Sequence, residues 1–234
     1  MELPSSSSDI TREHEHYLRH ILFLEQATSI VLKAIIKREK KKCGKDIGIL
    51  LNEPRYTFKT HYKTEYLQLF QEDVNDDIDT WDTLQLCAVL LALFKSDLTG
   101  PEVKAIQCIY DQRKDIERFV ECASLTYNTY KEKQHLLIEH LHGLMKLIDV
   151  KSDYNCTRMM VSFKTKSLQL SETQIGKLTQ TNDFKTHLKI AKEVFVSEND
   201  MIVEDNDRRG EINGTYSCFV LFLFDLSVII RIRT

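Results

Sequence analysis

The chain has 234 residues, of which 42% are hydrophobic and 29% are charged, and its formal net charge is −3. This is the composition of a folded globular chain, and its balanced charge excludes a global attraction to nucleic acid or to an anionic membrane. Only 7 glycines and 3 prolines occur, which disfavours a turn-dense all-β fold. We therefore expect an all-α protein with four to five main helices.

The six cysteines are widely scattered and include no CxxC pair, and polar serines follow the first residues of the chain. This pattern indicates neither a disulfide framework nor a cleavable signal peptide. We therefore expect reduced thiols and a cytoplasmic location.

Residues 1–9 carry no apolar pattern and are expected to form a flexible lead, whereas residues 10–150 are expected to form a helical bundle. The first long helix is predicted from apolar residues that recur at helical spacing, namely Tyr17, Ile21, Leu24, Val31 and Ile35. This helix ends before Gly44 in a basic cluster made of Lys37, Arg38, Lys40, Lys41 and Lys42. Such a cluster is either a patch for RNA or a protein partner, or a solvated helix end that favours the helix dipole; the second interpretation is favoured.

Two further helices are predicted as an antiparallel hairpin. Trp81–Phe94 is apolar almost all round, which is typical of a helix in the middle of a bundle. Thr99–Leu125 begins with a capping-box pattern, in which Glu102 follows Thr99 by three residues, and Pro101 suits a first turn. Another helix is expected over about 126–149.

Arg113 is a charge on the apolar stripe of the predicted helix 99–125. An unpaired buried charge is too costly to keep, so Arg113 must find partners or reach out of the packed layer. Candidate partners in the same chain are Asp82, Asp111 and Glu117. A carboxylate from a second copy is the alternative, and it predicts a self-association seam at this helix.

No metal site is expected. His16 and His20 are four residues apart, which zinc can use, but no regularly spaced cysteine or carboxylate pair completes the ligand set. The acidic stretch 72–82 lacks the glycine and the closing glutamate of a calcium loop. We predict no cofactor either.

Residues 151–234 are expected to contain a linker, one further helix over Ser171–Phe195 and the apolar segment Cys218–Ile230. That segment is shorter than the roughly 20 residues that a membrane span requires. Asp225 also interrupts it, so we do not expect membrane insertion.

Between Tyr17 and Asp149 the order of parts resembles the HEPN-type helical domain, found in the DAZ-interacting RING-finger ubiquitin ligase and in many invertebrate multidomain proteins. The segments that carry the resemblance are VLKAIIKRE (31–39), YLQLF (66–70), WDTLQLCAVLLAL (81–93), EVKAIQCIYDQRKDIERF (102–119) and LMKLID (144–149). The resemblance implies a helical bundle that pairs with a second copy.

In ribonuclease members of the HEPN group, an arginine and a polar residue precede a catalytic histidine by a few positions. Arg113 and Lys114 match the first part, but Arg118, Phe119 and Val120 occupy the histidine positions. Without an imidazole, no group there has a suitable pKa for acid–base cleavage of RNA. We therefore expect a non-catalytic protein-binding or self-associating adaptor, in ubiquitin-related or innate-immune signalling as the resemblance implies. The alternative is an RNA-binding domain or a residual ribonuclease that uses Arg113, Lys114 and Arg118.

Overall fold

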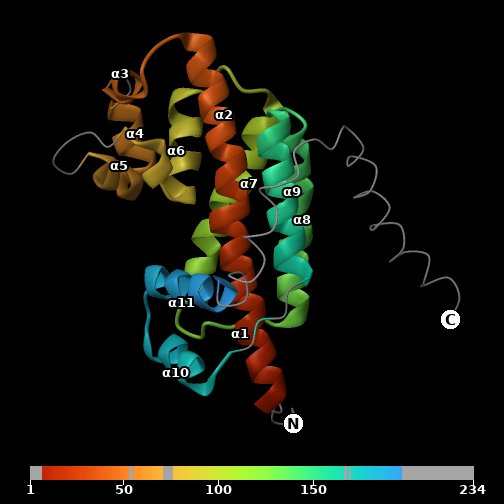
Figure 1. Ribbon diagram of the computed structural model, residues 1–234. Coiled ribbons are helices and arrows are strands. Elements are labelled where there is room, and N and C mark those ends of the chain that lie inside the picture. Colours follow the sequence, from red (N-terminus) through yellow and green to blue (C-terminus); the bar gives the residue numbers. More distant parts are fainter. Residues whose placement is uncertain (1–6, 53–54, 71–75, 166–167, 169, 197–234) are drawn as a thin grey trace, which may run out of the picture. The chain divides into compact units, whose positions relative to one another are not determined.

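The computed structural model describes residues 7–52, 55–70, 76–165, 168 and 170–196. All regular secondary structure in these residues is helical, which confirms the predicted all-α class (Figure 1). The helix begins at Ser7, so the last residues of the expected flexible lead are already helical.

One long helix forms the centre of the bundle. It consists of α1 (Ser7–Leu22), a π-helical turn, η1 (Phe23–Ala27), and α2 (Thr28–Cys43), which follow each other without a break. The predicted stripe is confirmed, since Tyr17, Ile21, Leu24, Val31 and Ile35 are all fully buried. Gly44 ends the helix with φ 67°, a left-handed conformation that suits glycine.

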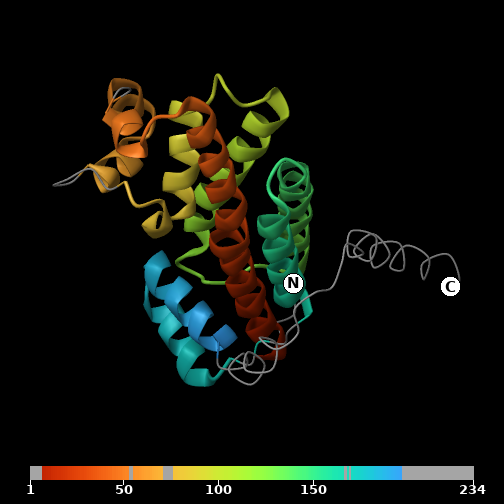
Figure 2. The same ribbon diagram turned by 45° about the horizontal axis from the view of Figure 1, so that its top comes forward.

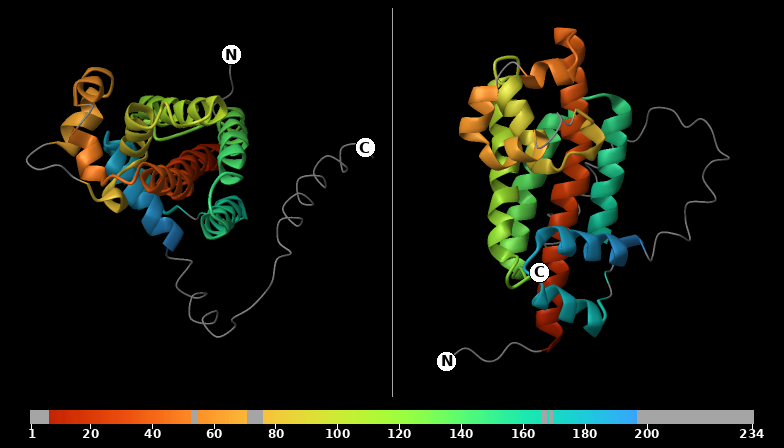
Figure 3. Two further views of the ribbon diagram at one scale, coloured as in Figure 1. Left: turned by 90° about the horizontal axis from the view of Figure 1, so that it is seen from above. Right: turned by 90° about the vertical axis from the view of Figure 1, so that its left-hand side faces the viewer.

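Around this central helix lie α6 (Thr83–Leu93), α7 (Gly100–Asp115), α8 (Tyr127–Met145) and α9 (Val150–Thr165) (Figure 3, left). α6 packs on α2 and α7, which confirms the hairpin, while α7 packs on α8 and α9 packs on α2. The capping box of α7 forms between Thr99 and Glu102, as predicted. α6 has its own capping box, between Asp82 and Gln85.

Short helices connect α2 to α6. They are α3 (Ile47–Asn52), α4 (Arg55–His61), α5 (Lys63–Leu69) and the 3-10 turn η2 (Ile78–Thr80). α3, α4 and α5 all contact α6, so they cover the side of α6 that the central helix leaves open. α7 is shorter than expected, because a 3-10 turn, η3 (Ile116–Phe119), follows it and Ala123 is left-handed with φ 47°.

The bundle does not end near Val150. α9 packs on α2 and on η1 and buries Cys156, Met160 and Phe163, and the compact unit continues to Val196. The predicted helix Ser171–Phe195 is two helices, α10 (Glu172–Gln180) and α11 (Phe184–Val196). α11 packs on the lower part of α1, and α10 packs on α11 (Figure 2). Cys218–Ile230 lies outside the described residues. In the part of the chain that the structure describes, no helix is long and apolar enough to cross a membrane.

Candidate functional site

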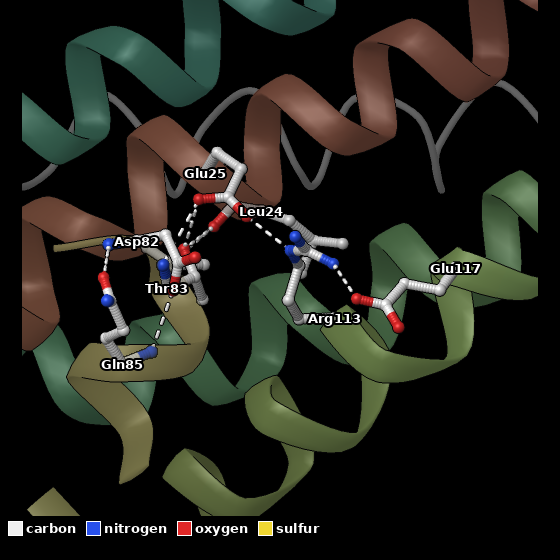
Figure 4. A network of polar contacts seen from close by, with 8 residues as sticks. Leu24, Glu25, Asp82, Thr83, Gln85, Arg113 and Glu117 are labelled. Carbon is white, nitrogen blue, oxygen red and sulfur yellow. Dashed lines mark hydrogen bonds and ion pairs between the residues drawn. The ribbon is translucent and has the colours of Figure 1, made fainter. Parts of the chain in front are cut away.

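Arg113 lies inside the bundle with partners from its own chain. Arg113 is only 5% exposed to solvent. The guanidinium donates from Nε to the Glu25 carboxylate and from Nη1 to Glu117 at 3.1 Å (Figure 4). Its flat face lies over the Phe184 ring of α11, with Cζ 3.5 Å from the ring centroid. The charge is thus neutralised by two carboxylates and covered by an aromatic ring.

Glu25 joins Arg113 to the start of α6. Its second carboxylate oxygen accepts from the Thr83 backbone N–H at 3.2 Å and lies 3.1 Å from the Thr83 hydroxyl. That hydroxyl also lies 2.8 Å from the Leu24 carbonyl oxygen. A negative charge at the N-terminus of α6 is favourable, because the first helical N–H groups have no intrahelical partner. We call Glu25, Thr83, Arg113 and Glu117 the Arg113 network.

This network corrects two sequence-based expectations. The carboxylate that pairs with Arg113 comes from the same chain, so the charge does not require a second copy. Of the candidate partners, Glu117 is correct, whereas Asp82 caps α6 and Asp111 accepts from Gln107. The sequence does contain a signal for Glu25 as a candidate partner, because its charge directly follows Leu24 within the apolar first helix.

Lys114 and Arg118 do not join Arg113. The Lys114 side chain is 49% exposed, lies 4.7 Å from the centre of the Tyr110 ring and is 3.9 Å from Glu65. The Arg118 side chain is 83% exposed and pairs with Asp115 at 3.1 Å. The three cations of the expected HEPN-like motif are therefore split, with one inside the bundle and two on its surface.

Lys114 and Arg118 instead line an open groove of about 1010 Å³ along α7, which we call the outer groove. Its lining comprises Lys95, Gly100, Val103, Lys104, Gln107, Cys108, Asp111, Gln112, Lys114, Asp115, Arg118 and Leu136. A hydrogen bond from Lys133 is the main cause that lowers the pKa of Asp115, and burial raises the pKa of the Cys108 thiol. At neutral pH the Asp115 carboxylate is therefore charged and the Cys108 thiol is protonated.

The basic cluster at the end of α2 contains both paired and unpaired cations. Arg38 pairs with the buried carboxylates Glu39 and Glu102, both at 2.6 Å. Lys42 pairs with Glu39 at 2.7 Å, and Lys40 pairs with Asp46 at 3.0 Å.

Lys37 and Lys41 differ from their neighbours, because no carboxylate of the described residues forms an ion pair with either. Both are exposed and line a second groove, of about 480 Å³, which we call the α2 groove. Its lining comprises Ile30, Lys33, Ala34, Lys37, Arg38, Lys41, Leu147, Ile148, Asp149 and Ser152.

The histidines that suggested a metal have structural contacts. The Nδ1 atom of His14 donates to the Ala123 carbonyl at 2.8 Å, and His16 stacks on Tyr130 with ring centroids 4.8 Å apart. His20 is fully buried next to Gln134. Within the described ranges, no three histidine, cysteine or acidic side chains are grouped as metal ligands.

Comparison with known proteins gives no family assignment. No family model matches the chain, and neither a curated protein nor a solved structure matches it. The resemblance to the HEPN-type domain therefore stays a prediction, and the function is inferred from the geometry of the two grooves.

Proposed function

We propose that the protein is a non-catalytic interaction module that associates with a second copy of itself through the outer groove. The observation that carries this proposal is the mixture of charges along the exposed side of α7. Cations at Lys104, Lys114 and Arg118 are interspersed with the carboxylates Asp111 and Asp115. A surface of mixed charge can complement itself, whereas a surface of one sign cannot.

An antiparallel arrangement about a two-fold axis near the middle of α7 fits this pattern. α7 spans Gly100–Asp115, so an axis near its middle sets Lys104 opposite Asp111 of the second copy, and the pair occurs twice. Lys104 has no ion-pair partner within the described part of the chain.

Apolar contact is expected to supply most of the affinity. Exposed ion pairs contribute little and mainly set the orientation of the partner. Val103 and Leu136, the latter 42% exposed, line the groove and would be covered by the second copy.

RNA binding is the second candidate, because Lys95, Lys104, Lys114 and Arg118 share this groove. Asp111 and Asp115 lie among these cations and would repel a phosphate backbone, which favours the protein partner. We propose no RNA cleavage in either case, since the histidine positions hold Arg118, Phe119 and Val120 and the groove lining includes no histidine. A role in ubiquitin-related or innate-immune signalling rests on the HEPN resemblance alone.

Sedimentation over a concentration series tests the proposal. We expect the wild type to dimerise and both Leu136→Asp and Lys104→Glu to shift the equilibrium to the monomer at least tenfold. The double variant Lys104→Glu/Asp111→Lys restores the opposite charges and should regain association. Lys177→Glu, an exposed change on α10, is the control that should have no effect.

A wild type that stays monomeric at tens of micromolar contradicts self-association, since a functional dimer needs at least this affinity. If labelled single-stranded RNA then binds the wild type and loses binding with Lys104→Glu, the second candidate function replaces the first.

A further inference from the structure

The α2 groove has a different charge pattern from the outer groove. Lys33, Lys37 and Lys41 follow each other at four-residue steps along α2, which places them about 6 Å apart on one side of the helix. Lys33 shares its charge with Asp79 at 3.5 Å, while Lys37 and Lys41 form no ion pair with the described residues. The groove thus presents a row of three lysines, and two of them, Lys37 and Lys41, have no ion-pair partner among the described residues.

Apolar side chains lie between these lysines and the turn after α8. Ile30 and Ala34 line the groove from α2, and Leu147 and Ile148 line it from the turn. Leu147 is 45% exposed. The alkyl stems of the lysines extend this apolar surface, because lysine keeps only its ammonium group in water. Apolar surface bordered by unpaired cations in a groove is a binding surface for an amphipathic segment.

The α2 groove has little negative charge of its own. Asp149 is its carboxylate, and it already accepts from the backbone N–H and hydroxyl of Ser152 at 2.9 and 2.7 Å. Those hydrogen bonds lower the pKa of Asp149 and keep its charge at the start of α9. A second copy placed symmetrically on this groove would set lysines against lysines, so self-association does not fit here.

Two other occupants also fit poorly. A bilayer surface is flat and would not reach a floor that lies between α2 and the α8–α9 turn. Single-stranded nucleic acid gains much of its affinity from stacking on aromatic rings, and the residues that line the groove include none. A helical protein segment can both enter the groove and supply the missing charges.

We infer that the α2 groove binds an acidic amphipathic helix of another protein, with carboxylates four residues apart opposite Lys37 and Lys41 and apolar side chains against Leu147 and Ile148. This inference deepens the proposed interaction function and rests on it. It uses a different surface, however, so the two sites can fail independently. A chain that carries both sites would connect copies of itself to an acidic partner, which is what an adaptor does.

A designed peptide serves as the probe. It is a fluorescein-labelled helix of 16 residues, with glutamates at i, i+4 and i+8 and leucines at i+3 and i+7, and its control has the same composition in scrambled order. We expect saturable binding of the designed peptide to the full chain by fluorescence anisotropy, weakened by salt. Lys37→Glu/Lys41→Glu and Leu147→Asp should each weaken it at least tenfold. Lys177→Glu/Lys192→Glu changes the net charge as much as the first variant does, at exposed positions of α10 and α11, and should leave binding unchanged.

Several results would overturn the inference. These are no saturation of binding up to about 1 mM peptide, equal binding of the scrambled peptide, and an equal loss in the two double lysine variants. Cosedimentation of the wild type with vesicles of phosphatidylcholine and phosphatidylserine that requires Lys37 and Lys41 would assign the groove to a lipid surface instead. Leu136→Asp separates the proposals, because it should abolish self-association and leave peptide binding intact.

Discussion

Arg113 and the pair Lys37 and Lys41 are cations that the sequence singles out, yet they lie in opposite environments. Arg113 is buried, and two carboxylates and an aromatic ring surround it. Lys37 and Lys41 are exposed beside a groove, while Arg38 between them is held by Glu39 and Glu102. Whether a cation is available to a partner is therefore decided by carboxylates that are distant in sequence, such as Glu25, 88 residues from Arg113.

Removing the buried charge should have the largest effect on stability. Arg113→Ala leaves Glu25 buried without its cation, which costs roughly 3–5 kcal/mol of unfolding free energy. Lys114→Ala, its exposed neighbour, should change the unfolding free energy by less than about 1 kcal/mol. Guanidinium unfolding followed by circular dichroism measures both.

The same experiment has an internal check. Adding Glu25→Gln to Arg113→Met removes the buried negative charge but keeps an acceptor for Thr83, so the double variant should be more stable than Arg113→Met alone. Equal losses for Arg113→Ala and Lys114→Ala would mean that the Arg113 network does not hold the bundle together.

A buried histidine should make the stability of the fold depend on pH, whereas an exposed histidine should not. Burial lowers the pKa of His20 to about 3, from an ordinary value of 6.5. The unfolded chain therefore binds a proton below about pH 6.5 that the folded chain does not bind. Stability is fully present above that pH and falls on acidification, by about 1.4 kcal/mol per pH unit for this group.

Urea unfolding between pH 7 and pH 5 measures this slope. We expect His20→Leu to flatten it by the contribution of one proton, whereas His135→Leu, at an exposed position of α8, should leave it unchanged. The pKa values of His142 and His187 are also lowered, mainly by burial, so part of the slope remains in both variants. Parallel slopes for the wild type and His20→Leu would show that His20 is accessible to protons.

The smallest effect is expected at an exposed ion pair. Lys40 and Asp46 are 3.0 Å apart, and their side chains are 39% and 66% exposed. Solvent and salt screen such a pair, so Lys40→Ala should leave the urea midpoint within experimental error. A loss comparable with that of Arg113→Ala would contradict the distinction between interior and surface cations.

Features that depend on residues close in sequence could be predicted. The capping box of Thr99 and Glu102, the left-handed Gly44 and the buried stripe of α1 and α2 all follow from spacings of a few residues. The pairing of Glu25 with Arg113 depends on how η1 and α7 meet, and no local pattern contains that information. The surface grooves have the same origin, since each is lined by two or more elements.

The C-terminal helices were harder to predict for a different reason. α9 buries Cys156, Met160 and Phe163 but also exposes apolar side chains, including Val150 and Tyr154, and apolar residues on both sides obscure the helical period. The division between α10 and α11 does have a local signal. Asp183 accepts from the Thr186 backbone at 2.9 Å at the start of α11, and a helix predicted straight through Ser171–Phe195 overlooks that cap.

The stacking of Phe184 on Arg113 has a consequence for how the chain is made. During synthesis, Glu25, Thr83 and Arg113 leave the ribosome early enough to pair, but the ring that covers the guanidinium arrives only after α8, α9 and α10 have been translated. The side of the bundle that holds Arg113 is therefore complete only once α11 has been made, and we expect α11 to dock late in folding.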